Sequence, residues 1–259
     1  IPKLFIAGII PGLLIAVLMA AYISISAWNI GLPTDENFKL RNAMRALYRS
    51  IAALSMPVLI LSGIYTGAFS PTEAGGFACA YAMFLGLAVY RNLTPYKILK
   101  AAMSAALTTA QIMILVAAAS VIAWIFTIEG IPQALISGAV DLNLSPIGFL
   151  LMVNALLLVI GCFLDPTSAI LVLAPLLVPI AISLGIDPVH FGIIMTVNLA
   201  IGMFTPPFGL NIFVAQSVLG VSAADIYRGV LPFFVVQVLA LALITLMPEL
   251  SLWLVETMS

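Results

Sequence analysis

The sequence has 259 residues, of which 64% are hydrophobic and 7% are charged, whereas roughly a quarter of the residues in a soluble domain are charged. This composition excludes a soluble globular fold, and the net charge of −1 argues against nucleic acid as a partner. Several apolar stretches reach the length of about 20 residues that crosses a bilayer. The sequence therefore predicts an all-α polytopic membrane protein that lies in a lipid bilayer.

The first apolar span covers residues 4–25 and comes almost directly after Ile1. No charged region precedes it and no cleavage site is recognisable, which is unlike a secretory signal peptide. We therefore expect this chain to begin inside a larger protein.

A polar segment at residues 29–50 follows the first span. Its basic residues stand mostly at helical spacing with apolar residues between them: Lys39, Arg41, Arg45 and Arg49. This pattern is typical of an amphipathic helix lying in the membrane interface, and it predicts one over residues 37–50. A plain solvated loop is the alternative.

Three further spans are expected at residues 51–69, 74–90 and 102–128. Between the first two, the stretch Ser-Pro-Thr-Glu at 70–73 predicts a helix start, in which Ser70 is the N-cap and Glu73 closes a capping box. A second basic stretch at 91–100 contains a similar cap and proline pair, Thr94-Pro95.

The last part of the sequence contains two interrupted apolar stretches. Residues 147–184 are interrupted at 161–168, residues 188–218 are interrupted at 202–209, and a final span covers 230–246. Irregular backbone at membrane depth is tolerated only where protein buries it or where it lines a wet cavity. Paired interruptions of this kind are typical of secondary transporters.

The positive-inside rule orients these spans. With both basic stretches and Arg228 in the cytoplasm, Lys3 is the one exception among the 9 lysines and arginines. This orientation makes residues 147–184 a hairpin that enters and leaves from the outside. The alternative is two full crossings joined at Asp165-Pro166, but that joint is short and apolar for a loop in water.

Asp165 is the most informative charge, because a carboxylate near the bilayer centre costs about 2.5–3.5 kcal/mol and usually faces a pathway or a partner. It is also a natural N-cap for a half-helix that starts at Pro166. Thr167 and Ser168 would add oxygen ligands or further caps. The two roles of Asp165 are compatible, and the sequence leaves both open.

The second interruption contains Thr205 followed by two prolines at 206–207. Two successive prolines cannot continue a helix, and they free carbonyl groups upstream. Gly202 and Gly209 permit unusual backbone angles on either side. A simple kink is the alternative. Two asparagines flank this break and can form packing hydrogen bonds or contact a ligand, namely Asn198 and Asn211.

Four stretches resemble a known family: LFIAGIIPGLL (4–14), GIYTGAFSPTEAGG (63–76), GCFLDPTSA (161–169) and GIDPVHFGIIMTVNLAIGMFTPPFGLNIFVA (185–215). They resemble the C-terminal portion of the large membrane (M) subunit of tripartite ATP-independent periplasmic (TRAP) transporters. The resemblance covers nearly the whole chain. It implies an ion-transporter-superfamily-like inverted-repeat fold with a re-entrant hairpin and a discontinuous helix.

The resemblance also implies a function. It points to a sodium-coupled secondary transporter of the bacterial inner membrane that imports organic acids, of the dicarboxylate or sialic-acid type, by an elevator mechanism. A periplasmic substrate-binding protein would deliver the substrate, and a small membrane subunit would support the scaffold. Na⁺ is the expected coupling ion, and neither an organic cofactor nor another metal is expected.

In this family, sodium is held at hairpin tips and helix breaks. The matching positions here are Gly161, Asp165, Thr167, Ser168, Gly202, Thr205 and Phe208, the last through its carbonyl. The substrate-cavity candidates at the same two interruptions are Pro166, Asn198, Pro206, Pro207, Gly209 and Asn211.

The expected parts of the chain are the last helix of an earlier repeat (1–28), scaffold helices (29–145), a transport part (146–222, with hairpin 147–184 and broken helix 188–218) and a final transmembrane helix (223–259). The large subunit of the family also has a first half with its own hairpin. Because that N-terminal half is missing from this chain, the chain alone is not expected to transport.

Two other functions are weighed against this one. An intramembrane protease needs a Ser–His pair or two aspartates at membrane depth, whereas the sequence offers an interfacial His190 and a deep Asp165, so an enzyme is not expected. A non-transporting scaffold or channel subunit without an ion site would have continuous helices, and the two interruptions argue against it.

Overall fold

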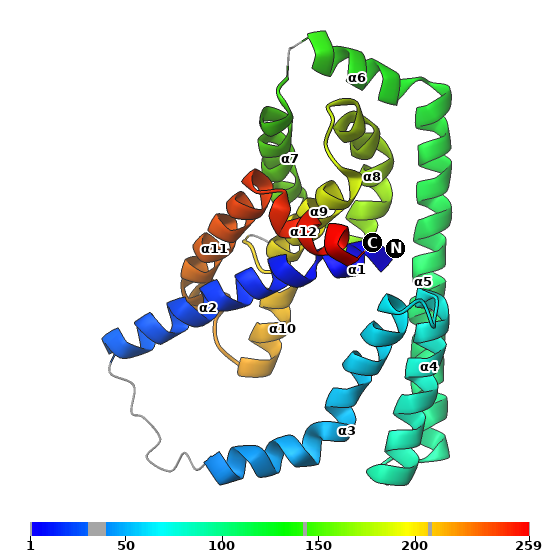
Figure 1. Cartoon of the computed structure of the whole chain (residues 1–259), viewed down its shortest axis with the longest axis vertical. Helices are drawn as coiled ribbons and strands as arrows, with labels where there is room; N and C mark the ends of the chain where they lie inside the picture. Colours follow the sequence, from blue (N-terminus) through cyan, green and yellow to red (C-terminus); the bar gives the residue numbers. More distant parts are fainter. Residues whose placement is uncertain (1, 31–39, 142–143, 207–208, 259) are drawn as a thin grey trace. The chain divides into compact units, whose positions relative to one another are not determined.

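The computed structural model describes residues 2–30, 40–141, 144–206 and 209–258, and within these ranges it contains helices and no strand (Figure 1). In chain order the helices are α1 (Pro2–Ala7), α2 (Ile9–Ile30), α3 (Leu40–Tyr65), α4 (Pro71–Phe84), α5 (Pro95–Ile128), α6 (Ile131–Asp141), α7 (Pro146–Gly161), α8 (Pro166–Ser183), α9 (Pro188–Gly202), α10 (Leu210–Leu219), α11 (Ala223–Leu246) and α12 (Glu249–Met258). A short π-helical turn, Leu85–Val89, continues α4.

Several of these helices have the length and apolar composition of membrane spans. Among the described residues, five segments qualify: Pro2–Trp28, Pro71–Val89, Pro95–Ile128, Pro166–Ser183 and Ala223–Leu246. The bent helix α3 makes a sixth if its two parts are counted as one span, and α7 and α9 are apolar but shorter. The chain is an all-α polytopic membrane protein, as its sequence predicted.

The helices form two compact units. One consists of residues 1–2 and 30–111, and so contains α3, α4 and the first half of α5. The other consists of residues 3–29 and 112–259, and contains the remaining helices. The predicted division into scaffold and transport parts concerns movement during transport, and it stays a prediction.

Many of the helices start with a side-chain cap followed by proline. Such caps, each with an oxygen that accepts a hydrogen bond from a backbone N–H of the first turn, are Ser70, Ser145, Asp165 and Asp187. The proline fits because the first helical N–H has no partner within the helix. At α4 the predicted capping box is present, since the Ser70 N–H donates to Glu73 Oε2 at 2.8 Å and the Glu73 N–H donates to Ser70 Oγ at 3.3 Å.

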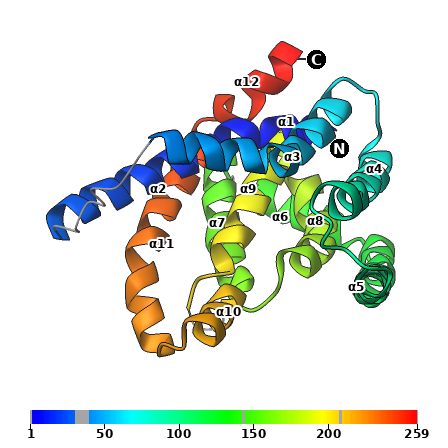
Figure 2. The ribbon, with the colours of Figure 1, turned by 90° about the horizontal axis from the view of Figure 1, so that it is seen from below.

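Helix α9 is the centre of the second unit, where it contacts α7, α8, α11 and α12. Nine of its 15 residues are buried, as expected for a helix that is apolar on all sides. Phe191 of α9 stacks on Phe149 of α7, with ring centroids 6.0 Å apart. Figure 2 shows α9 beside α7, with α10 below α9 and α11 to the left of both α7 and α9. The best-packed core therefore surrounds the helix that ends at the second interruption.

Candidate functional site

The chain leaves helical geometry at both places that the sequence predicted. Helix α7 ends at Gly161 and α8 begins at Pro166, so the first break is a short turn between two apolar helices. Helix α9 ends at Gly202 and α10 begins at Leu210, so the second break is longer. The structure therefore confirms the interruptions as features of the backbone.

Two of the predicted site residues, Gly161 and Gly202, bring the breaks together. A Cβ atom built on Gly202 would lie 2.5 Å from both Cα and the carbonyl carbon of Gly161, and one built on Gly161 would lie 3.1 Å from Gly202 Cα. No other amino acid fits such an approach of two backbones. The C-terminal ends of α7 and α9 are thus in direct contact.

This contact has an electrostatic consequence. The C-terminal end of a helix carries a partial negative charge from its unpaired carbonyl groups, which favours a cation nearby. Here two such ends, at Gly161 and Gly202, meet inside the second unit, where both glycines are buried. The arrangement is suited to a small cation bound by backbone oxygens.

Asp165 is the N-cap of α8. One carboxylate oxygen accepts a hydrogen bond from the Ser168 N–H at 3.1 Å, and the other accepts from the Ser168 hydroxyl at 2.5 Å. The capping role that the sequence allowed is therefore present. Pro166 is the first residue of α8 and is partly buried, whereas Thr167 is exposed. A sodium-binding role for these side chains stays a prediction.

The second break is folded back on itself by backbone hydrogen bonds. The Gly209 N–H donates to the Thr205 carbonyl at 3.1 Å, and the Asn211 N–H donates to the Met203 carbonyl at 2.9 Å. The Thr205 N–H also donates to the Gly202 carbonyl at 3.0 Å. Gly209 is required for this compact turn, because a Cβ there would lie 2.8 Å from the Met203 carbonyl oxygen.

The Thr205 side chain bonds to the end of α9. Its hydroxyl donates to the Ile201 carbonyl at 2.7 Å, so its oxygen lone pairs are left to accept or to bind a cation. Pro206 is exposed. Pro207 and Phe208, which the sequence singled out for substrate and sodium contacts, lie outside the described residues.

Asn198 belongs to a buried chain of polar side chains. Its side-chain N–H group donates to Asn154 Oδ1 of α7 and to the Ile194 carbonyl, both at 2.8 Å. The Asn154 amide in turn donates to Thr245 Oγ1 of α11 at 2.9 Å. The chain joins α7, α9 and α11, which supports the packing role that the sequence offered for Asn198. Asn211, by contrast, lies at an exposed position.

Asn154 and Thr245 are functional candidates that the sequence analysis missed. Both are buried, and each is a polar residue in an otherwise apolar stretch. A polar residue within a membrane segment usually has a partner or a role, so this signal was present in the sequence. It does not reveal which residue is the partner.

His190 lies at the other end of α9, about 18 Å from Gly202 along the helix at 1.5 Å per residue. It is next to Asp187, whose Oδ1 accepts a hydrogen bond from the His190 N–H at 3.1 Å. Its ring is buried and lines a pocket of about 310 Å³ formed by the first turns of α7 and α9 and the end of α11. Among the described residues, neither ring nitrogen has a hydrogen-bond partner.

Acidic and other strong metal ligands do not gather at the breaks. In the part of the chain that the structure describes, no three His, Cys, Asp or Glu side chains are placed to hold a metal ion. A cation at the Gly161–Gly202 contact would therefore be bound mainly by carbonyl and hydroxyl oxygens, which are the ligands of hard cations.

Comparison with known proteins agrees with the architecture. Residues 1–250 match the family model described as the tripartite ATP-independent periplasmic transporter, DctM component. The chain is 42% identical over 250 residues to the C4-dicarboxylate TRAP transporter large permease protein DctM of Pseudomonas aeruginosa, covering 96% of this chain and 58% of that protein. The chain thus spans somewhat more than half the length of that relative.

Two further relatives carry different substrate names. The chain is 39% identical to the isethionate TRAP transporter permease protein DctMQ of Oleidesulfovibrio alaskensis, over 98% of this chain and 40% of that protein. It is 36% identical to the sialic acid TRAP transporter large permease protein SiaM of Vibrio cholerae, over 99% of this chain and 60% of that protein. These relatives are transport permeases and not enzymes. The chain, with its apolar helices and two breaks, belongs to the DctM family of TRAP transporter large permeases.

Proposed function

We propose that this chain is part of the large permease of a sodium-coupled TRAP transporter that imports an organic acid across the bacterial inner membrane. The observation that supports it most is the contact of Gly161 with Gly202, which brings two helix C-termini together. Broken helices in secondary transporters bind Na⁺ through such ends and through unwound carbonyls. Thr205, whose hydroxyl already lies against the end of α9, would add a side-chain oxygen.

The anionic nature of the substrate is supported by the same two breaks. Helices α8 and α10 begin there, and the positive end of a half-helix favours an anionic group. The relatives named above are permeases for a C4-dicarboxylate, isethionate and sialic acid, each of which carries an acidic group. We infer a carboxylate or sulfonate substrate whose anionic group binds at the start of α10.

We propose that transport occurs by an elevator movement. The hairpin α7–α8 and the broken helix α9–α10 would move together, because the Asn154–Asn198 hydrogen bond and the glycine contact tie α7 to α9. The helices within residues 51–127 would be the scaffold, and the hairpin would be re-entrant. Bound Na⁺ would offset the partial negative charge of the two helix ends and so stabilise the form that binds substrate.

The remaining components are also part of the proposal. The family is tripartite, so we infer that a periplasmic substrate-binding protein delivers the substrate and that a small membrane subunit accompanies the large one. The rest of the large subunit would supply the other wall of the substrate cavity.

The function is tested by substrate uptake into proteoliposomes that contain the complete large subunit and its partners. We expect uptake to require a sodium gradient. Thr205→Ala should raise the sodium concentration for half-maximal uptake by about tenfold, which corresponds to ~1.4 kcal/mol.

Thr196→Ala is the matched control, because Thr196 lies within α9, before the break, and makes the same kind of hydroxyl-to-carbonyl bond, to Gly192 at 2.8 Å. Uptake that is indifferent to sodium and to Thr205→Ala would contradict the proposal and favour a scaffold or channel without an ion site.

A further inference from the structure

The start of α3 combines exposed basic side chains with exposed apolar ones. Helix α3 bends by 59° between Arg41–Tyr48 and Ser50–Tyr65. The part before the bend carries the basic residues, and the part after it is apolar. A helix with this division can lie along the membrane surface with its first part and cross the membrane with its second.

The first part of α3 has an apolar stripe. Met44, Leu47 and Tyr48 follow the spacing i, i+3, i+4 that places side chains on one face of a helix, and Ile51 continues the spacing just after the bend. Their exposed fractions are 62%, 57%, 78% and 58%. An exposed apolar stripe next to basic residues is the pattern of a helix whose apolar face enters the boundary between lipid headgroups and acyl chains.

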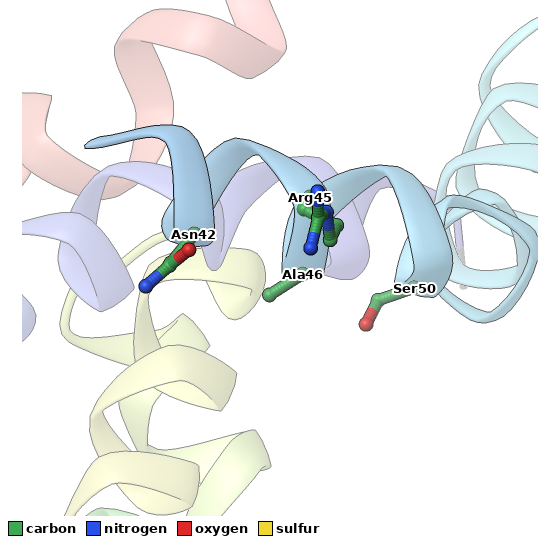
Figure 3. A pocket seen from close by; sticks show the side chains of 4 residues that line it. All are labelled: Asn42, Arg45, Ala46 and Ser50. Atoms are coloured by element: carbon green, nitrogen blue, oxygen red, sulfur yellow. The ribbon is translucent and has the colours of Figure 1, made fainter. Parts of the chain in front are cut away.

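The opposite face of the same part is basic and polar. Asn42, Arg45 and Ala46 line an open hollow along it, which continues past the bend to Ser50 (Figure 3). In that view Asn42, Ala46 and Ser50 point to one side of the helix, and Arg45 lies between them. The small Ala46 leaves room beside the guanidinium group.

No acidic residue lies anywhere within α3, so the helix provides no carboxylate that would neutralise Arg41 or Arg45. An arginine binds a phosphate with two parallel hydrogen bonds. The amide of Asn42, one turn before Arg45, can donate to a remaining phosphate oxygen.

We propose that residues 41–50 bind anionic phospholipid on the cytoplasmic side of the membrane. Arg45 holds the headgroup phosphate, Asn42 adds a hydrogen bond, Arg41, one turn before Arg45, adds positive charge, and the apolar stripe lies among the acyl chains. The lipid is chosen over free phosphate because the apolar stripe and the charged face belong to one short segment. The cytoplasmic leaflet carries negative charge, which attracts basic segments next to a span.

The test uses the complete large subunit with its small subunit, purified in detergent. Native mass spectrometry counts bound phosphatidylglycerol and bound phosphatidylcholine as each lipid is titrated. Because each basic residue near an anionic surface is worth about fivefold in affinity, we expect Arg41→Gln/Arg45→Gln to lower phosphatidylglycerol affinity by at least about tenfold. Phosphatidylcholine binding should not change.

Lys97→Gln/Lys100→Gln is the matched control, since it removes the same charge from the other basic stretch, where Lys97 Nζ donates to the Asn92 carbonyl at 2.9 Å. It should keep wild-type affinity for phosphatidylglycerol. Arg45→Lys keeps the charge but not the paired hydrogen bonds, so its affinity for phosphatidylglycerol should lie between those of wild type and the double glutamine variant. An intermediate affinity in this conservative variant would show that the loss in the double variant is not a folding defect.

The proposal is overturned if the double arginine variant binds phosphatidylglycerol as wild type does, or if the lysine variant loses as much. It is also overturned if millimolar inorganic phosphate displaces the lipid completely, because the face would then be a free-phosphate site. None of these outcomes depends on transport, so the result is independent of the proposed sodium coupling.

Discussion

The two breaks of this chain are closed in different ways. The first, between α7 and α8, is closed by a side chain. Asp165 caps α8, and its carboxylate accepts hydrogen bonds from both the N–H and the hydroxyl of Ser168. The second, between α9 and α10, is closed by backbone groups, and Gly209 at the start of α10 supplies no side-chain cap.

The difference separates the roles of the two breaks. A carboxylate at the start of α8 already offsets the positive end of that helix, whereas α10 has no such group, so an anionic substrate is expected at α10. The ends of α7 and α9 meet instead at Gly161 and Gly202, which is where we propose that the cation binds.

The largest effect is expected from Gly202→Leu. Even a Cβ at this position would lie 2.5 Å from the Gly161 backbone, so the larger side chain must push α7 and α9 apart. Overpacking of this kind costs typically 1–3 kcal/mol and occasionally more. We expect uptake to be abolished and the thermal midpoint of the purified complex to fall.

Gly12→Leu is its control, because a Cβ on Gly12 meets no atom within 4 Å. If Gly202→Leu has the same thermal midpoint and the same uptake as Gly12→Leu, the two helix ends are not in contact in the working protein.

A smaller effect is expected from Asn198→Leu, which leaves the buried Asn154 Oδ1 without its donor. An unpaired buried polar group costs about 1–3 kcal/mol. The thermal midpoint should fall, whereas Asn211→Leu, at an exposed position, should leave it nearly unchanged. The double variant Asn154→Leu/Asn198→Leu should recover part of the loss. Losses that simply add would show that the two asparagines are not coupled.

The smallest effect on stability is expected at the cap of α8. Asp165→Ala should lower the free energy of unfolding by about 1 kcal/mol, the usual value of an N-cap. Asp165→Asn keeps a capping oxygen but removes the charge, so it separates capping from ion binding. If the first break is only capped, Asp165→Asn keeps the sodium dependence of uptake. A large rise in the sodium requirement would instead assign the carboxylate to the ion.

The local features of this fold were predictable because their signals are local. A cap followed by proline at residues 70–71, 145–146 and 165–166 fixes where helices start, and Gly202 together with the prolines at 206–207 shows where one ends. The basic spacing at 37–50 predicted the amphipathic part of α3 that is described from Leu40 onward. Each of these depends on residues within one or two helical turns.

The contacts that make the site could not be predicted in the same way. Asn198 bonds to Asn154 across 44 residues, and Asn154 bonds to Thr245 across 91. Many polar residues in apolar stretches could have formed such pairs, and only the packing of α7, α9 and α11 selects these. The contact between Gly161 and Gly202 is of the same kind, because a glycine in a sequence does not show which backbone approaches it.

Na⁺ is proposed to bind where α7 and α9 end, and equilibrium binding of ²²Na⁺ to the purified complete permease measures this without transport. We expect saturable binding by wild type, equal binding by Thr196→Ala, and binding weakened by about tenfold, or ~1.4 kcal/mol, in Thr205→Ala. Wild-type binding by Thr205→Ala, with the protein folded, would contradict the proposal and place the ion away from this break.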